Sequence, residues 1–460
     1  MSGFCQSCLE KQRKIDRLEQ TVSLLRARLR YQERVASQEG FFGSSTPSSK
    51  IPLKANTLAE RQMRRGGARP GHVGHGRKAL SDEAADRVET ISVKESTCPD
   101  CGVRLKDNGL RRRTVIDCEP IRSQVTLYHL RIKRCPRCQR TFQARPPGVL
   151  PKSLYGNQLL THIAVQHYIY GTSLGRLEEQ TGIGYGSLID ALHRLGALLS
   201  KVPDRLLKHY RRSVVKHADE TGWRTDGQNG YAWLFCTEQI SLFRFRQTRS
   251  ASVPKEVFGE KRLGGVLVVD RYNAYNKVPC AIQYCYAHLL REVEDLEREF
   301  PENSEIQSFA SVFGPLLAQA MTLRSLSIQD GPFYHQAQKL KQKILEAVHR
   351  EAKHPGIHRI QGIFRENQQR LYQWVENRQV PAENNRAERE LRPLVVARKV
   401  SFGSQSQAGA KTRETLMTVL CTLRKRFPDF QARFKNALDQ LALNPKRDLY
   451  ELLFPSHSPP

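Results

Sequence analysis

The stretch Gly265-Val266-Leu267-Val268-Val269-Asp270 decides the fold of this chain. Four consecutive valine or leucine residues are typical of a strand that is buried on both faces, as in the parallel part of an α/β sheet. Asp270 ends the run, and functional side chains collect at the carboxyl ends of such strands. The sequence therefore predicts a sheet with a candidate functional carboxylate at its rim.

Three other segments, 214–219, 231–236 and 242–245, have the alternation or short apolar runs of strands. The first of them closes on a second aspartate, Asp219. If the strands of Asp219 and Asp270 are neighbours, the two carboxylates come within a few ångströms of each other. Like charges that close need a hard divalent cation between them.

A third carboxylate is available on the segment 383–393, which predicts a short helix. Glu388 lies one helical turn from Asn384 and Asn385, whose amides are placed to orient it. Pro393 is expected to end or kink this helix, because proline removes a backbone donor. Each of these residues alone would ordinarily be a solvated acid, so the prediction of a site depends on the three acids together.

The charge of the chain favours a polyanionic partner. Its 460 residues include 74 lysines and arginines against 46 acidic residues, a formal charge of +28. This excess favours nucleic acid over an anionic membrane surface. No apolar run approaches the roughly 18 residues of a membrane span, and the first residues lack a signal-peptide pattern, so we expect no membrane and a cytoplasmic, nucleoid-associated protein.

Six of the eleven cysteines form three CxxC pairs; the pair Cys5 and Cys8 stands alone near the N-terminus, whereas the pairs at 98–101 and 135–138 lie within one segment of the chain. In a reducing compartment such pairs are read first as metal ligands, and two of them complete a tetrahedral structural Zn²⁺ site. Alternation at Val125, Leu127 and His129 predicts a hairpin between the pairs. The predicted zinc ligands are Cys98, Cys101, Cys135 and Cys138.

Arginines gather in three places where a phosphate backbone would suit them. Residues 61–77 hold five arginines and five glycines without an acid, so they cannot bury a core but can order on DNA. The other two clusters lie in the zinc module and beside Glu388. The predicted DNA-binding residues are Arg64, Arg65, Arg69, Arg77, Arg111, Arg112, Arg113, Arg386, Arg389, Arg392, Arg398 and Lys399.

Two helical regions precede the predicted sheet. Apolar residues at Ile15, Leu18, Val22, Leu25 and Leu29 follow one helix seam, which predicts a short coiled coil or a helix that lies on its own protein. Residues 155–210 predict helices interrupted at Gly182-Ile183-Gly184, the outline of a helix-turn-helix. We expect this helix pair to read bases while the zinc module and basic segment bind backbone, although most such helix pairs only pack.

Taken in order, several motifs resemble the DDE transposases of the insertion-sequence-66 family (TnpC-type). The matching motifs are Asp219-Glu220-Thr221-Gly222-Trp223-Arg224, Val268-Val269-Asp270-Arg271-Tyr272-Asn273-Ala274-Tyr275-Asn276, Cys285-Tyr286-Ala287-His288, Asn384-Asn385-Arg386-Ala387-Glu388-Arg389, Arg392-Pro393 and Arg398-Lys399. The PGHxGH run at 70–75, the N-terminal helix and the four-cysteine module match as well, so the resemblance covers nearly the whole chain.

The resemblance implies a ribonuclease-H-like catalytic core with Asp219, Asp270 and Glu388 as catalytic triad and as ligands of Mg²⁺ (or Mn²⁺). It implies strand cleavage at the ends of an insertion sequence and strand transfer to target DNA by two-metal phosphoryl transfer. The interval between Asp270 and Glu388 is too long for a simple crossover, so we expect a helical insertion there. Two ends must be paired, so we expect at least a homodimer, with accessory proteins of the same element as further partners.

The expected fold class is therefore multidomain α+β, with the parts in a definite order. These are a coiled-coil helix (1–38), a linker with the basic segment (39–90), a zinc ribbon (91–150), a helix-turn-helix-like domain (151–211), the first part of the core (212–285), the helical insertion (286–380) and the end of the core with C-terminal helices (381–460).

Two other functions remain open on the residues alone. A non-catalytic, zinc-containing DNA-binding protein, such as a domesticated or inactive transposase, would carry the same modules. The HxxR spacing of His288 and Arg291 is also that of tyrosine recombinases, for which Tyr450 would be the nucleophile, but the strand at 266–269 is out of place in such a helical domain. Cys285 and His288 have the spacing of a metal pair, although packing or a DNA contact is the favoured role.

Overall fold

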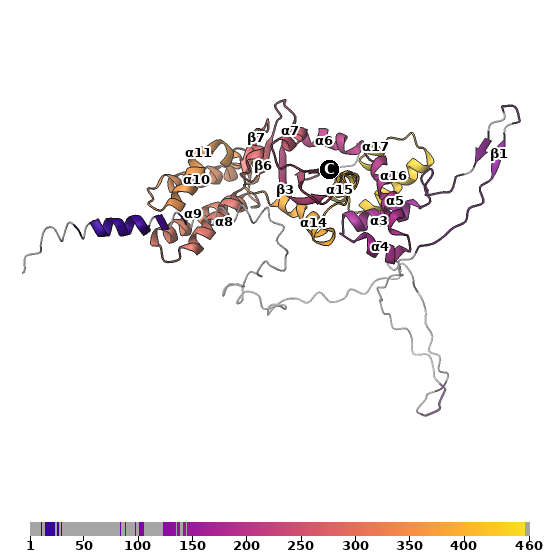
Figure 1. Cartoon of the computed structure of the whole chain (residues 1–460), viewed down its shortest axis with the longest axis horizontal. Coiled ribbons are helices and arrows are strands. Elements are labelled where there is room, and N and C mark those ends of the chain that lie inside the picture. The colour runs from indigo at the N-terminus through magenta and orange to yellow at the C-terminus, as the bar shows by residue number, and fades with distance from the viewer. Residues whose placement is uncertain are drawn as a thin grey trace, which may run out of the picture. The chain divides into compact units, whose positions relative to one another are not determined.

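The computed structural model describes residues 145–455 throughout and only short stretches before them (Figure 1). Those stretches are residues 11, 14–23, 25–26, 29, 83, 88, 97, 101–104, 123–134, 136–138 and 141–143. The chain divides into two compact units, Met1–Ser45 with Ser123–Pro460, and Thr46–Arg122. The boundary at 122 falls inside the predicted zinc module, and the fold described below belongs to the larger unit.

A five-stranded mixed sheet in the order β5-β4-β3-β6-β7 forms the centre of this unit. Strands β3, β4 and β5 make an antiparallel meander, while β6 and β7 lie parallel to β3. Their bounds are β3 (Val215–Thr225), β4 (Gln228–Cys236), β5 (Ser241–Arg246), β6 (Val266–Val269) and β7 (Ala281–Tyr284). The four predicted strands are confirmed, and β6 is buried on both faces as expected. The four-residue β7 is too short to have been predicted from alternation.

Strand β3 differs from the prediction, because it continues past Asp219 to Thr225. Its parallel pairing with β6 is recorded only as far as His217 and Val268, whereas its antiparallel pairing with β4 runs on to the hairpin. Asp226 and Gly227 at the turn both have positive φ (52° and 72°), as a type I′ hairpin turn requires. The prediction that Asp219 closes its strand is therefore wrong, although Asp219 does lie just beyond the recorded parallel pairs.

The outer edge of the sheet at β5 is covered by helix α15 (Gln407–Arg426). Backbone N–H groups of β5 donate to side chains of this helix at alternate strand positions: Ser241 to Thr422, Phe243 to Thr418 and Phe245 to Glu414. The three acceptors are spaced four residues apart, so they lie on one face of α15. The helix thus satisfies an edge that would otherwise be free to pair with another chain.

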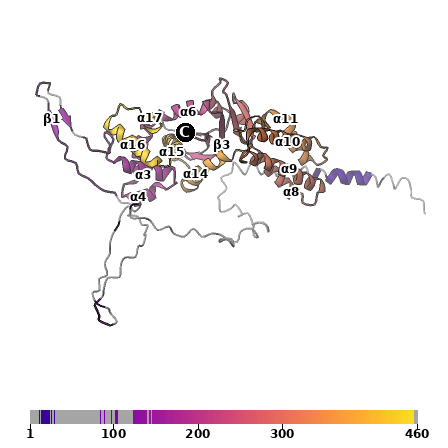
Figure 2. The ribbon, with the colours of Figure 1, turned by 180° about the vertical axis from the view of Figure 1, so that it is seen from behind.

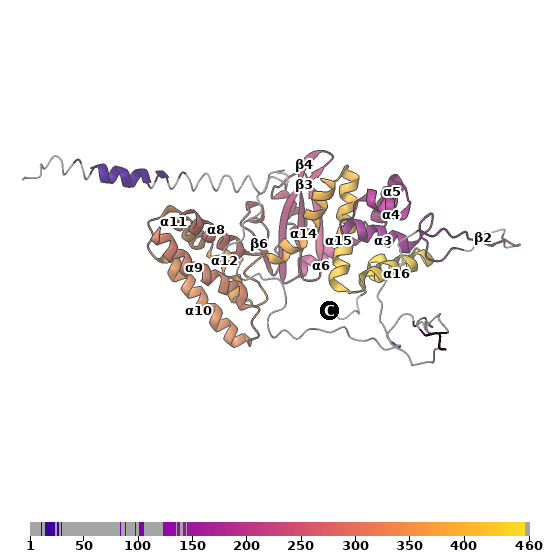
Figure 3. The same ribbon diagram turned by 90° about the horizontal axis from the view of Figure 1, so that it is seen from below.

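Helix α14 (Asn385–Ser401), which carries Glu388, packs against β3 and β4 (Figure 3). It runs through Pro393, so the proline does not end the helix; the other expected effect, a kink, stays a prediction. Leu391, Leu394 and Ala397 around the proline are buried in the core. Their burial offsets the hydrogen bond that proline cannot make.

Within residues 145–455, four helices precede the sheet: α3 (Asn157–Tyr168), α4 (Leu174–Thr181), α5 (Tyr185–Leu198) and α6 (Val202–Arg212). The predicted break between α4 and α5 is present. Gly182 caps α4 in the left-handed conformation (φ 67°), where glycine has no steric penalty. Helices α3 and α5 both contact α15, and their buried residues belong to the same hydrophobic core as the sheet.

Helices also fill the interval between β7 and α14, as expected. They are α8 (Tyr286–Glu299), α9 (Ser304–Leu323), α10 (Asp330–His349), α11 (Pro355–Glu366), α12 (Gln368–Leu371) and α13 (Gln373–Glu376). Helix α9 packs between α8 and α10, and the four longer helices stay together in Figures 1 and 2. Contrary to the expectation from sequence, α9 is long and apolar enough to span a bilayer. Its apolar residues Ile306, Phe313 and Leu317 are fully buried, as in the core helix of a bundle.

The zinc module is described only in part. Strands β1 (Ile132–Arg134) and β2 (Thr141–Gln143) pair around the second CxxC turn, whereas the predicted hairpin at 125–129 has no strand. Val125 is fully exposed and Leu127 is 81% exposed, so their alternation reflects no buried face. Cys98 and Cys135 lie outside the described residues, as do the predicted DNA-binding arginines of 61–77 and 111–113.

Residues 14–23 near the N-terminus are helical, as predicted. The seam residues Ile15, Leu18, Val22, Leu25 and Leu29 are each 45–57% exposed. A helix with an exposed apolar seam is suited to pairing with another helix. Self-association through this seam stays a prediction.

Candidate active site

The structure brings Asp219, Asp270 and Glu388 together from three separate elements. Asp219 lies on β3, Asp270 directly follows β6, and Glu388 is in the first turn of α14. Strands β3 and β6 are parallel neighbours with His217 opposite Val268. Asp219 and Asp270 each follow two residues later, so they take matching positions on the same face of the sheet. Burial raises the pKa of Asp219 well above its ordinary value, and the charges of Glu220, Asp270 and Glu388 raise it further.

Each of the three carboxylates is oriented by a different contact. Asp219 Oδ1 accepts the N–H of Glu220 at 2.9 Å, and Asp270 Oδ1 accepts the N–H of Tyr272 at 3.0 Å. Glu388 is paired with Arg291 of α8 at 3.2 Å. A cation beside Glu388 reduces the repulsion that three clustered carboxylates would otherwise produce.

The donor set of this cluster suits a hard divalent cation. Carboxylate oxygens are the ligands that Mg²⁺ and Mn²⁺ take, and mutually repelling carboxylates gain most from a cation among them. The pKa of Asp219 is raised first by burial, and the neighbouring carboxylates of Glu220, Asp270 and Glu388 add to the rise. Asp219, Asp270 and Glu388 therefore fit the metal that the sequence predicted.

Cys285 and His288 lie against the same cluster at the start of α8. Single ligand atoms of Cys285, His288 and Glu388 all fall within 4.8 Å of one another. His288 Nδ1 is buried without a hydrogen-bond partner, 3.9 Å from Glu388 Oε1. The Cys285 thiol is engaged, because it accepts the N–H of Asn384 at 3.1 Å, and burial raises its pKa to about 12. These contacts support a packing role for Cys285, as the sequence favoured.

Asn384 joins three elements behind the carboxylates. Its side chain is 1% exposed; Oδ1 lies 2.9 Å from His217 Nδ1, and Nδ2 donates to the Ala218 carbonyl at 2.8 Å. Together with its N–H bond to Cys285, these contacts connect β3, the start of α8 and the start of α14. The expectation that this amide orients Glu388 directly is wrong, because its polar atoms are used by β3. It instead fixes the strand residue that precedes Asp219.

A second network holds the loop that follows Asp270. Glu220 is almost completely buried and pairs with Arg249 at 2.8 Å, and it also accepts the hydroxyl proton of Tyr275 at 2.5 Å. The Tyr272 hydroxyl donates to the Arg249 carbonyl at 2.6 Å, and the Arg249 guanidinium lies over the Tyr272 ring. Sequence analysis missed this role of Glu220, since nothing in its spacing to Arg249 or Tyr275 predicts that they meet.

The predicted arginines of α14 do not share one surface. At 100° per residue, Arg392 lies one turn after Glu388 on its face, whereas Arg386 and Arg389 are turned away from it. Arg386 and Arg389 line a pocket whose lining residues exclude all three candidate carboxylates. Arg398, in the last turn, lies close to Gly222 of β3, and Arg392 and Lys399 are exposed.

Comparison with known proteins identifies the family of this chain. The family model described as "Transposase IS66 family" matches residues 152–412, more than half of the chain, and includes all three carboxylates. The model described as "zinc-finger binding domain of transposase IS66" matches residues 95–139, which contain the CxxC pairs at 98–101 and 135–138 and support a structural zinc ion.

Two curated relatives come from Sinorhizobium fredii (strain NBRC 101917 / NGR234). The uncharacterized protein y4qI is 25% identical over an alignment of 322 residues, which covers 60% of this chain and 58% of y4qI, less than two thirds of its length. The uncharacterized protein y4hP is 22% identical over an alignment of 424 residues, which covers 82% of this chain and 76% of y4hP. By the extent of the family match and the residues within it, this chain belongs to the IS66 family of transposases.

Proposed function

We propose that this transposase cuts DNA at the ends of its insertion sequence and joins the freed strand to target DNA, with Asp219, Asp270 and Glu388 as its catalytic residues. The observation that carries the proposal is the convergence of these three carboxylates from β3, β6 and α14. The sheet supports it, because a three-stranded antiparallel meander extended by two parallel strands is the arrangement of a ribonuclease-H-like core. The helices 286–376 then form the insertion ahead of the third acid.

In the first step, water attacks the phosphorus at a transposon end and the P–O3′ bond breaks, leaving a 3′-hydroxyl and a 5′-phosphate. In the second step, that hydroxyl attacks a phosphodiester of the target in the same way. Mg²⁺ or Mn²⁺ held by the three carboxylates would supply charge neutralisation and activation of the attacking oxygen. The reaction needs no covalent bond between protein and DNA.

The surrounding residues keep the carboxylates in position. Asn384 holds β3 against the start of α14, which sets Asp219 relative to Glu388. Glu220 and its partners hold the loop that begins at Asp270. Arg392, exposed on the face of Glu388, is suited to a phosphate beside the cut.

The remaining modules provide DNA binding and assembly in this proposal. Cys98, Cys101, Cys135 and Cys138 would hold the structural Zn²⁺ of the zinc finger. The arginines of 61–77 and 111–113 would contact backbone, and the exposed N-terminus of α5 would read bases. A homodimer paired through the N-terminal seam would bring two ends together.

The test is Mg²⁺-dependent nicking of labelled DNA that carries the element's own ends. Wild type should leave free 3′-hydroxyls, whereas Asp219→Asn, Asp270→Asn and Glu388→Gln should reduce cleavage at least a hundredfold with DNA binding intact. Glu366→Gln is a matched control, because Glu366 is exposed on α11 away from the cluster. Wild type that binds the ends but never cuts, even with the neighbouring gene products, would favour the non-catalytic DNA-binding protein.

The same assay separates a tyrosine recombinase. Tyr450 is 6% exposed, and the guanidinium of Arg205 lies over its ring at 3.9 Å, so its ring is packed. Tyr450→Phe should therefore cut as wild type does. Loss of cutting together with a covalent protein–DNA adduct in wild type would refute the metal-dependent mechanism.

A further inference from the structure

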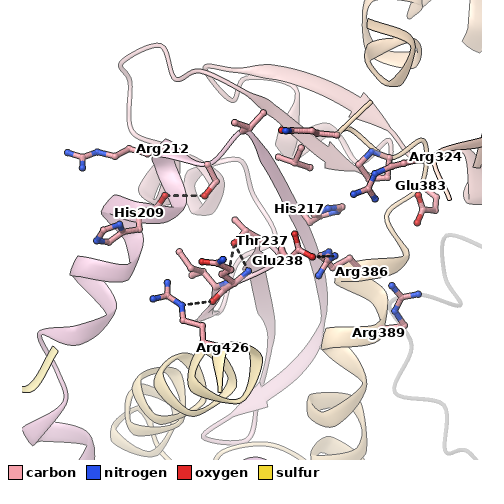
Figure 4. A pocket seen from close by; sticks show the side chains of 17 residues that line it. His209, Arg212, His217, Thr237, Glu238, Arg324, Glu383, Arg386, Arg389 and Arg426 are labelled. Carbon is pink, nitrogen blue, oxygen red and sulfur yellow. Dashed lines mark hydrogen bonds and ion pairs between the residues drawn. The ribbon is translucent and has the colours of Figure 1, made fainter. Parts of the chain in front are cut away.

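A pocket of about 580 Å³ lies apart from the carboxylate cluster and is lined by cations (Figure 4). Its arginines come from five places along the chain: the ends of α6, α9 and α15, and two positions near the start of α14. Figure 4 shows Arg212 on one side of the pocket and Arg324, Arg386 and Arg389 on the other. The charged residues that line it are Arg212, Arg324, Arg386, Arg389, Arg426, Glu238 and Glu383.

The described part of the chain neutralises the cations of this pocket only in part. Arg212, Arg324 and Arg389 are exposed, and no carboxylate of residues 145–455 lies within ion-pair distance of them. Arg386 meets Glu238 only at 3.8 Å, and Glu238 is 84% exposed. Five arginines against two glutamates leave a net positive pocket, which costs free energy unless an anion is bound.

The electrostatic effects on neighbouring groups agree with a positive pocket. Burial lowers the pKa of His209, and the charges of Arg426 and Arg212 lower it further. Burial raises the pKa of Glu383, while Arg324, Arg389 and Arg386 oppose that rise. The guanidinium groups therefore act on the pocket interior from both sides.

The chemistry of the lining favours phosphate. Apart from histidine, every cation among the described lining residues is an arginine, and guanidinium pairs with phosphate in a bidentate way. The lining has no tyrosine, tryptophan or phenylalanine to stack on a base, so the contact would be to backbone. A transposase with a charge of +28 meets phosphodiesters in DNA.

We propose that this pocket binds the phosphodiester backbone of DNA at a point separate from the strand being cut. The inference rests on the proposed function for the identity of the ligand, but not on catalysis. It reassigns Arg386 and Arg389 from the phosphates flanking the cut to this second contact, and adds Arg212, Arg324 and Arg426, which sequence analysis did not single out. His217 connects the two places, because it lines the pocket and contacts Asn384 behind Asp219.

The test measures DNA binding by fluorescence anisotropy with full-length protein, without Mg²⁺, between 50 and 300 mM salt. Each phosphate contact contributes about 0.9 to the slope of log K against log salt. The double variant Arg324→Ala/Arg389→Ala should therefore reduce the slope by about 1.8 and the affinity at least tenfold at low salt. Arg365 of α11 is exposed and has no ion pair within residues 145–455, so it supplies the control Arg365→Ala, which should change neither.

A variant with the opposite effect guards against misfolding. Glu238→Gln removes the acid beside Arg386, so it should tighten DNA binding two- to threefold. A damaged fold would not produce tighter binding. If Arg324→Ala/Arg389→Ala keeps the wild-type slope and affinity, the proposal is wrong; it is equally wrong if that variant loses binding of a mononucleotide while DNA binding is unchanged.

Failure of this inference can be told from failure of the proposed catalysis. Asp270→Asn should keep the wild-type salt slope, since Asp270 does not line the pocket. If the double arginine variant has a lower salt slope than wild type but wild type never nicks DNA, the catalytic proposal is refuted and this one stands. If wild type nicks DNA but the double arginine variant keeps the wild-type salt slope, only this proposal is refuted.

Discussion

Replacing Asn384 by alanine should destabilise the core, because its amide holds two buried partners on strand β3. The amide is 1% exposed and contacts His217, itself 3% exposed, and the carbonyl of Ala218. Losing it leaves His217 Nδ1 buried and unsatisfied, at a cost of about 1–3 kcal/mol, and removes a second hydrogen bond worth about 0.5–1.5 kcal/mol. We expect the free energy of unfolding to fall by about 2–4 kcal/mol.

Urea denaturation followed by tryptophan fluorescence measures this loss. Trp223, Trp233 and Trp374 are all at most 2% exposed, so their emission reports the unfolding of the core. The matched control is Asn385→Ala, one residue along; Asn385 makes no side-chain hydrogen bond within residues 145–455 and should change stability by less than about 0.5 kcal/mol. An Asn384→Ala variant no less stable than Asn385→Ala would refute the role assigned to the amide.

Three further predictions concern single residues near the site. Burial lowers the pKa of His217 to about 4, so the folded state favours the neutral imidazole. The contribution of neutral His217 to the free energy of unfolding is present above pH 6.5 and is lost as the pH falls towards 4. In urea titrations at each pH, wild type should therefore lose about 2 kcal/mol more stability than His217→Gln between pH 7 and pH 5. Arg291→Ala removes the cation paired with Glu388, so the Mg²⁺ concentration for half-maximal nicking should fall two- to fivefold. An unchanged or higher Mg²⁺ concentration would show that the ion pair between Arg291 and Glu388 does not compete with the metal. Glu220→Gln weakens the hold on Tyr275, so single-turnover cleavage should slow about tenfold with unchanged DNA affinity; equal rates would show that this network does not position Asp270.

Four of the five strands of the core were predictable from local pattern, and with them the positions of Asp219 and Asp270 in the sheet. A run of valine and leucine that ends on Asp270 has few uses outside a buried strand, because both faces must be covered. The CxxC pairs and the glycine break after α4 are equally local, since each depends on residues within a few positions. The hairpin at Asp226-Gly227 carried such a signal too and was not recognised, which is why β3 was expected to end at Asp219.

Other features depend on contacts between residues far apart in the chain. Asn384 and Glu220 look like solvated polar residues in sequence, and only the approach of His217, Arg249 and Tyr275 makes them part of the site. Pro393 should have ended a helix by its own chemistry, but burial of its neighbours against the sheet outweighs one missing hydrogen bond.

The arginines of α14 illustrate, within a single helix, the difference between what local sequence predicts and what tertiary packing decides. Local sequence places Arg386, Arg389 and Arg392 next to Glu388 and specifies their charge, which is enough to predict phosphate as their ligand. Which of them shares a surface with Glu388 depends on the rotation at which α14 packs on β3 and β4, and on the arginines that α6, α9 and α15 bring to the same pocket. Chemical type is a property of each residue in the chain, whereas shared location arises only when distant segments pack into one core.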